Sequence, residues 1–228
     1  MLIDAERDAE NRKILAEIKA STIGMEDTFK FGCKMCGDCC RKRSEPVFVM
    51  GYDIYNIAKA LDMHPVEALI EYTQCVKGTD SHLPTVFLKE RLDGSCRLLR
   101  NGKCTIQSEK PVVCRVFPLG RYIDGEKIHY FSQQNCTGKG EEIKLKDWID
   151  TFNLSEMDEV SIVWSKLVGS AALYMRTLDR KPQKAEEFFK ACFHVFYCDY
   201  DMSKPAVDSL REGAKRLEKE FKGFKVNL

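Results

Sequence analysis

The chain of 228 residues carries 36 basic and 35 acidic side chains, which gives a formal net charge of +1. With 44% apolar residues, it has the composition of an ordinary globular protein and is long enough to bury one sizeable core. Because the charges balance, the composition argues against nucleic acid and against a membrane surface as partners.

The sequence carries no signal for export or membrane insertion. Residues 1–13 are heavily charged and lack the apolar segment of a secretory signal. The most apolar later run, residues 167–175, is much shorter than the roughly 20 residues that cross a bilayer. We therefore expect a soluble, cytoplasmic protein.

The first predicted element is a helix over residues 4–20, which are rich in strong helix formers. Its apolar face is thin, so we expect it to pack loosely or to contact a protein partner. That face consists of Ala9, Ile14, Leu15 and Ile18. A short strand at residues 29–31 is predicted to lead into a cysteine-rich loop.

Residues 33–40 read C-K-M-C-G-D-C-C and place four cysteines within eight residues. The C-x2-C-x2-C spacing matches the opening of the bacterial ferredoxin run, which supplies three thiolates to an iron–sulfur cluster. A zinc site would instead use C-x2-C as one knuckle and take two ligands from a second. Both interpretations need a remote thiolate. Neighbouring side chains of an extended chain point to opposite sides, so Cys39 and Cys40 are predicted not to share one small site.

The middle of the chain is predicted to combine short helices with hairpins. Asn101-Gly102 marks a tight turn between Cys96 and Cys104, so antiparallel strands should bring these two thiols to one site. The other predicted elements are a strand over residues 46–50, helices over 52–61 and 66–72, a strand-forming stretch at 85–88, and a hairpin over 121–132 that turns at Asp124-Gly125.

Three helices are predicted in the last third of the chain, over residues 155–180, 182–197 and 205–221. The first has apolar residues three and four apart, with Ala172 and Leu173 widening the stripe, and is expected to be central and buried. The sequence thus predicts an α+β fold. It consists of an N-terminal helix (1–24), a small metal-stabilised cysteine-rich core of short β-hairpins and helices (25–142), and a helical region packed on that core (143–228).

Eleven cysteines need an explanation, because a reducing compartment favours metal binding over disulfides. Cys75, Cys192 and Cys198 are predicted to be small buried apolar residues. The other eight could form two four-sulfur sites, or one cluster with supporting thiols, and their spacing does not choose between these. The predicted metal ligands are Cys33, Cys36, Cys39, Cys40, Cys96, Cys104, Cys114 and Cys136.

Cationic residues accompany these cysteines and would stabilise an anionic thiolate centre. Arg41–Arg43 follows Cys40, and further basic residues flank the later thiols: Arg97, Arg100, Lys103 and Arg115. Histidine ligands are not indicated. None of the histidines lies three to five residues from another, so each is expected at the surface or satisfied in the core: His64, His82, His129 and His194.

Several motifs occur in an order that resembles a known family. They are C-K-M-C-G-D-C-C (33–40), the Asp53-Ile54 helix start, the Cys96/Cys104 pair, K-P-V-V-C-R-V-F-P-L (110–119) and N-C-T-G-K-G (135–140). Over roughly residues 28–150 the chain is similar to the YkgJ-type cysteine cluster proteins, also called the CxxCxxCC family, a zinc- or iron-chelating domain. The resemblance implies that the eight cysteines are metal ligands or their neighbours. It also implies that Pro111, Arg115 and Pro118 shape the loop around Cys114.

Three functions stay open at this point. The first is an iron–sulfur protein of the 4Fe-4S type with an electron-transfer, sensing or scaffold role, favoured because the thiols exceed what one closed zinc site needs. The second is an all-cysteine zinc protein. The third is suggested by the related flagellin lysine methylases and is a protein lysine methyltransferase-like enzyme using S-adenosylmethionine. The sequence shows neither a catalytic constellation nor a glycine-rich cofactor loop for it.

Overall fold

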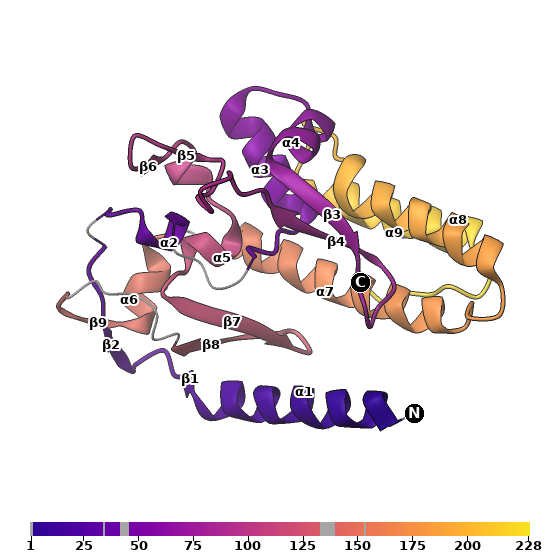
Figure 1. Ribbon diagram of the computed structural model, residues 1–228, viewed down its shortest axis with the longest axis horizontal. Coiled ribbons are helices and arrows are strands. Elements are labelled where there is room, and N and C mark those ends of the chain that lie inside the picture. Colours follow the sequence, from indigo (N-terminus) through magenta and orange to yellow (C-terminus); the bar gives the residue numbers. More distant parts are fainter. Residues whose placement is uncertain (1, 34, 42–45, 133–139, 153) are drawn as a thin grey trace. The chain divides into compact units, whose positions relative to one another are not determined.

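The computed structural model describes residues 2–33, 35–41, 46–132, 140–152 and 154–228. It combines small antiparallel sheets with a helical C-terminal part (Figure 1), so the predicted α+β class is confirmed. The chain forms two compact units. The first unit consists of Met1–Lys34 and Val116–Leu154, and the second unit consists of Met35–Arg115 and Ser155–Leu228. The division predicted at residues 24/25 and 142/143 stays a prediction.

The first unit is built on antiparallel strands. A three-stranded sheet has the order β1-β8-β7, and β2 pairs with β9. The predicted hairpin is confirmed, because β7 and β8 pair up to Asp124 and Lys127 around Gly125, whose φ is +63°. The elements are α1 (Leu2–Ala20), β1 (Thr22–Ile23), β2 (Thr28–Lys30), β7 (Leu119–Asp124), β8 (Lys127–Ser132), β9 (Glu142–Lys144) and α6 (Leu145–Asp150).

Aromatic side chains form much of the core of the first unit. The Trp148 ring packs edge-on against Phe29 and Phe31, with ring centroids 6.2 and 5.0 Å away. Phe31 is buried. In α1, by contrast, residues 9–20 are exposed apart from the half-buried Ile18. This agrees with the loose packing expected from the thin apolar face of that helix.

The second unit contains the cysteine-bearing middle of the chain and the C-terminal helices. Two short sheets pair β3 with β4 and β5 with β6. The elements are α2 (Asp38–Arg41), α3 (Gly51–Leu61), α4 (Pro65–Tyr72), β3 (Thr73–Lys77), β4 (Pro84–Leu88), β5 (Leu99–Arg100), β6 (Lys103–Cys104), η1 (Gln107–Glu109), α5 (Val112–Arg115), α7 (Ser155–Arg176), α8 (Pro182–Phe193), the π-helical turn η2 (His194–Cys198) and α9 (Ala206–Glu220).

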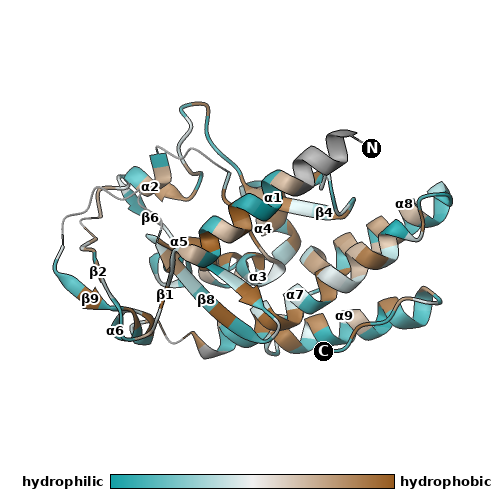
Figure 2. Cartoon of the chain, turned by 90° about the horizontal axis from the view of Figure 1, so that it is seen from below, coloured by the Kyte–Doolittle hydropathy of each residue, from teal (hydrophilic) through white to brown (hydrophobic). Residues whose placement is uncertain are grey.

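The core of the second unit lies where α3, α7, α9 and η2 pack together. Ile54, Leu167 and Leu210 have no exposed surface, and both α7 and α9 carry hydrophobic and hydrophilic bands in Figure 2. The buried stripe predicted for the first C-terminal helix is therefore confirmed, although Leu173 is 67% exposed and does not widen it. No helix among the described residues combines the length and apolar character needed to cross a lipid bilayer.

Two predicted elements differ from the structure. Residues 46–50 form a single bridge, between Phe48 and Phe87, instead of a full strand. The helix predicted to reach residue 197 leaves regular α-geometry after Phe193, where the wider turn η2 begins. This turn is closed by the Asp199 N–H, which donates to the His194 carbonyl oxygen at 3.0 Å.

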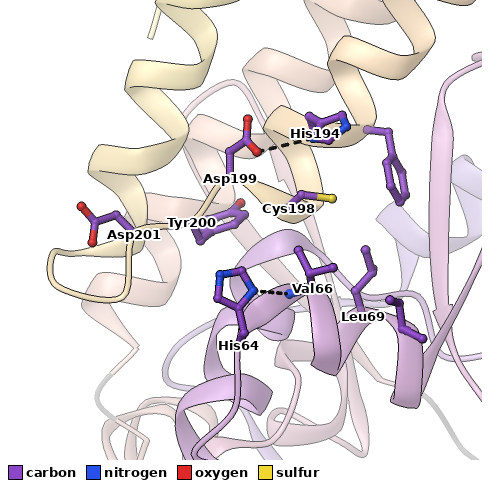
Figure 3. Close-up of a pocket in the computed structure, with 10 residues that line it drawn as sticks. His64, Val66, Leu69, His194, Cys198, Asp199, Tyr200 and Asp201 are labelled. Carbon is purple, nitrogen blue, oxygen red and sulfur yellow. Dashed lines mark hydrogen bonds and ion pairs between the residues drawn. The ribbon is translucent and has the colours of Figure 1, made fainter.

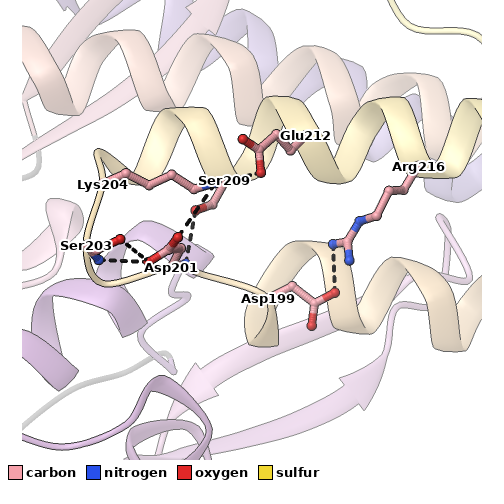
Figure 4. Close-up of polar contacts among 7 residues, drawn as sticks. All are labelled: Asp199, Asp201, Ser203, Lys204, Ser209, Glu212 and Arg216. Atoms are coloured by element: carbon pink, nitrogen blue, oxygen red, sulfur yellow. Dashed lines mark hydrogen bonds and ion pairs between the residues drawn. The ribbon is translucent and has the colours of Figure 1, made fainter.

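Polar side chains order the loop between η2 and α9 (Figure 4). Asp201 accepts hydrogen bonds from the backbone N–H of Ser203 at 2.9 Å and from its hydroxyl at 2.6 Å. Arg216 of α9 reaches back to Asp199 of this loop, at 2.7 Å. These contacts tie the loop to itself and to α9.

Candidate metal centre

The first cysteine segment of the second unit turns back on itself before α2. Met35 and Gly37 adopt left-handed conformations, with φ of +51° and +73°. The Cys40 N–H donates to the Gly37 carbonyl oxygen at 3.0 Å, and Arg41 Nη1 donates to the Cys36 carbonyl oxygen at 2.7 Å. The glycine within the motif thus supplies the turn that presents the neighbouring thiols.

This segment packs against the hairpin that carries Cys96 and Cys104, and α2 lies near β6 and α5 in both Figure 1 and Figure 2. The Cys96 N–H donates to the Cys40 carbonyl oxygen at 2.7 Å. A Cβ atom on Gly37 would lie 3.2 Å from the Gly102 carbonyl oxygen, which is a close approach of the two loops. Leu99 pairs with Cys104 in the hairpin. Thiols that are distant in the sequence are therefore brought together.

Cys39 and Cys40 have their sulfur atoms 3.9 Å apart. They lie in the helical turn α2 and not in an extended chain, where adjacent side chains would diverge. In a helical turn the two side chains leave the backbone on adjoining sides, so the thiols can meet. The assumption of divergence is wrong for this pair.

The two thiols do not ionise independently. With Cys40 as donor, the hydrogen bond between them lowers the pKa of the Cys39 thiol to about 6, and Lys110 assists while burial opposes. The same bond raises the pKa of Cys40 far above its ordinary value, and burial and the nearby thiols of Cys39, Cys96 and Cys114 raise it further. The metal-free pair therefore loses its first proton readily and its second only with difficulty.

The pKa of the Cys104 thiol is also influenced by neighbouring thiols. Burial is the largest cause that raises the pKa of its thiol, Lys110 opposes this, and Cys96 and Cys39 add smaller increases. Charges influence one another in this way only when they are close in space. Five of the predicted ligands, contributed by α2, the hairpin and α5, therefore gather in one part of the second unit.

Three predicted ligands remain besides these five. Cys36 is exposed in the turn before α2, Cys33 is exposed and belongs to the first unit, and Cys136 lies outside the described residues. Among the described side chains, no three His, Cys, Asp or Glu residues surround a point where a metal ion would fit. The donor set itself fits zinc and iron, both of which thiolates bind. A closed site requires these cysteine side chains to turn toward a common point.

The cysteines predicted to be buried and apolar give a mixed result. Cys192 and Cys198 are buried as predicted, and burial raises the pKa of both thiols, that of Cys198 to about 11. The prediction is wrong for Cys75, which is exposed on β3. The chain changes directly from α4 to this strand, because Thr73 and the residues after it pair with β4.

Two basic residues beside the thiols are not among the cations predicted from the sequence. Arg91 donates from Nη1 to the Cys96 carbonyl oxygen at 3.0 Å and from Nη2 to that of Arg97 at 2.8 Å, which holds the Cys96 segment. Lys110 lowers the pKa of both Cys39 and Cys104. Nothing in the sequence indicates the role of Arg91, but Lys110 stands in the same K-P-V-V-C motif as Cys114.

The predicted cations take several roles. Arg97 pairs with Glu71 at 3.5 Å, and Arg41 fastens the turn at Cys36. The Arg115 side chain is only 14% exposed and lies 3.6 Å from Glu109. Lys42 and Arg43 lie outside the described residues.

In the metal-free protein at pH 7, we expect iodoacetamide to alkylate Cys39 several-fold faster than Cys75. The pKa of Cys39 is about 6, whereas partial burial raises the pKa of Cys75 above the ordinary value of a thiol. Most of Cys39 but only a small fraction of Cys75 is then thiolate, and the weaker nucleophilicity of the more acidic thiolate offsets part of that difference. Peptide mass spectrometry measures both rates. The Cys39 rate should level off above about pH 7 while the Cys75 rate still climbs at pH 8, and identical pH profiles would contradict the assignment.

A separate open groove of about 640 Å³ lies between α4 and η2 (Figure 3). None of the predicted ligand cysteines lines it. His64 caps α4, since its Nδ1 accepts from the Val66 N–H at 3.2 Å, and His194 Nδ1 lies 3.5 Å from Asp199. Both histidines thus have structural partners, in agreement with the sequence-based expectation.

The gathered thiols define a cysteine-rich class of domain. Residues 32–137 match the model of the CxxCxxCC family, described as "Putative zinc- or iron-chelating domain". The match includes all eight predicted ligand positions and confirms the resemblance drawn from the motifs. No curated protein and no solved structure matches the chain.

Proposed function

We propose that this protein binds an iron–sulfur cluster of the 4Fe-4S type through cysteine thiolates and uses it in a redox, sensing or scaffold role in the cytoplasm. The observation that supports the proposal is the gathering of five thiols in the second unit: Cys39, Cys40, Cys96, Cys104 and Cys114. A 4Fe-4S cluster is held by four cysteine thiolates, and this group can supply them. The C-x2-C-x2-C spacing adds the pattern of a ferredoxin loop.

Zinc is the second candidate, and one distance favours it. Ligand sulfurs about 2.3 Å from a tetrahedral zinc ion lie about 3.8 Å from each other, and the sulfur atoms of Cys39 and Cys40 are 3.9 Å apart. In a cubane the thiolates bind different irons and lie farther apart, so two sulfurs this close would not both be cluster ligands. No observation favours a methyltransferase activity, and none is proposed.

Anaerobic purification followed by iron, acid-labile sulfide and zinc analysis tests the two candidates. We expect brown protein with about four iron and four sulfide ions per chain. Colourless protein with one zinc and no sulfide would replace the cluster by the zinc alternative. Protein that holds neither metal, even after incubation with ferrous iron and sulfide or with zinc ions, would overturn both.

A further inference from the structure

Asp53 is a carboxylate buried in the second unit, with 1% of its surface exposed. Its Oδ2 accepts the N–H of Met50 at 2.8 Å, which caps the start of α3. Its Oδ1 accepts the N–H of Val112, also at 2.8 Å. A buried carboxylate is stable only when such donors replace its lost hydration. Asp53 therefore joins the beginning of α3 to the beginning of α5.

The segment that it holds is too short to orient itself. α5 spans only Val112–Arg115, and its internal bonds are those that Cys114 and Arg115 donate to the Pro111 carbonyl oxygen, both 2.9 Å. A single turn has no stability of its own in water. The direction of this turn, and with it that of Cys114, must come from contacts with other elements.

α3 is the rigid partner. Eight of its residues are buried, and it packs on α4, α9 and η2. The matching carboxylate in the next helix is Glu67, which accepts the His64 N–H at 3.1 Å at the start of α4. That contact is exposed and reaches no cysteine segment. Asp53 and Glu67 thus make the same cap, and only Asp53 extends a second oxygen to the turn that carries a predicted ligand.

We propose that Asp53 is a positioning residue for the metal centre, which fixes α5 so that the Cys114 sulfur faces the thiols of α2 and of the hairpin. This inference rests on the proposed metal-binding function. Cys114 raises the pKa of Cys40, which is consistent with the two thiols being neighbours. Loss of contacts that orient metal ligands costs about 10–100-fold in metal affinity.

The test compares Asp53→Ala with the matched variant Glu67→Ala in the full chain, with zinc ions as the probe. Each change removes one helix cap, but only Asp53→Ala frees α5. We expect competition with a chromophoric chelator to show at least about tenfold weaker zinc binding for Asp53→Ala and an unchanged affinity for Glu67→Ala. In the zinc-loaded protein, alkylation mapped by mass spectrometry should label Cys114 in Asp53→Ala and leave it protected in Glu67→Ala.

A second variant breaks the same bond from its other side. Val112→Pro removes the donated N–H at the first position of α5, where proline is tolerated, and leaves the cap of α3 intact. It should reproduce both the weaker zinc binding and the labelling of Cys114, and it decides the question if Asp53→Ala does not fold. Wild-type affinity with a protected Cys114 in the folded variants would overturn the inference. Failure of the wild-type protein to bind zinc or to protect any thiol would instead count against the proposed function.

Discussion

Each of three single substitutions should lower the metal affinity of the protein by about 100-fold or more: Cys39→Ser, Cys96→Ser and Cys114→Ser. Removing a contact that merely orients a ligand already costs about 10–100-fold, and serine supplies a hydroxyl where iron and zinc prefer a thiolate. Metal analysis of the purified variants, with chelator competition for affinity, measures the loss. The effect should be similar at the three positions, because the proposal makes them parts of one site.

Cys192→Ser is the matched control, since it makes the same chemical change at a thiol that is buried among apolar residues of α8. It should lower stability, because a buried hydroxyl needs a partner, and leave metal content at the wild-type level. Cys75→Ser, on the exposed strand β3, should change neither the stability nor the metal content of the protein. Full metal retention in all three ligand variants, or a large loss in Cys192→Ser, would contradict the assignment.

Removal of the metal should loosen the cysteine-bearing part of the second unit and leave its helical part folded. α2 and α5 have four residues each, and β5 and β6 have two each, which is too short for independent stability. Structural zinc contributes about 10–16 kcal/mol in zinc-finger peptides. If metal removal lowers the free energy of local opening by even about 3 kcal/mol, hydrogen exchange should become about 100-fold faster at the N–H groups of Cys40 and Cys96.

Hydrogen exchange of the loaded and chelator-treated protein measures this difference. Amides in the middle of α7 and α9 serve as the internal reference, because these helices bury residues such as Leu167 and Leu210 completely. Their exchange should stay slow in both states. Unchanged protection of Cys40 and Cys96 after complete metal removal would show that the metal does not hold this part together.

Most helices and hairpins could be predicted from the sequence because apolar spacing and turn residues lie within the element that they specify. Apolar residues three and four apart located α3, α4, α7 and α9, and Asp124-Gly125 located the hairpin of the first unit. The predictions failed where a long-range partner decides the structure. Cys75 follows a helix in sequence but lies in a strand because β4 is available to pair with it, and the π-helical turn at His194–Cys198 has no signature of its own.

For the candidate site, the sequence by itself determined the donor chemistry. The number, spacing and type of the cysteines indicate a soft metal without any coordinates, since ligand preference is a property of the thiolate. Only the tertiary structure decided which thiols meet. The bond from the Cys96 N–H to the Cys40 carbonyl, and the carboxylate of Asp53 between α3 and α5, join segments far apart along the chain. Such contacts depend on how the whole unit packs, so no window of sequence contains them.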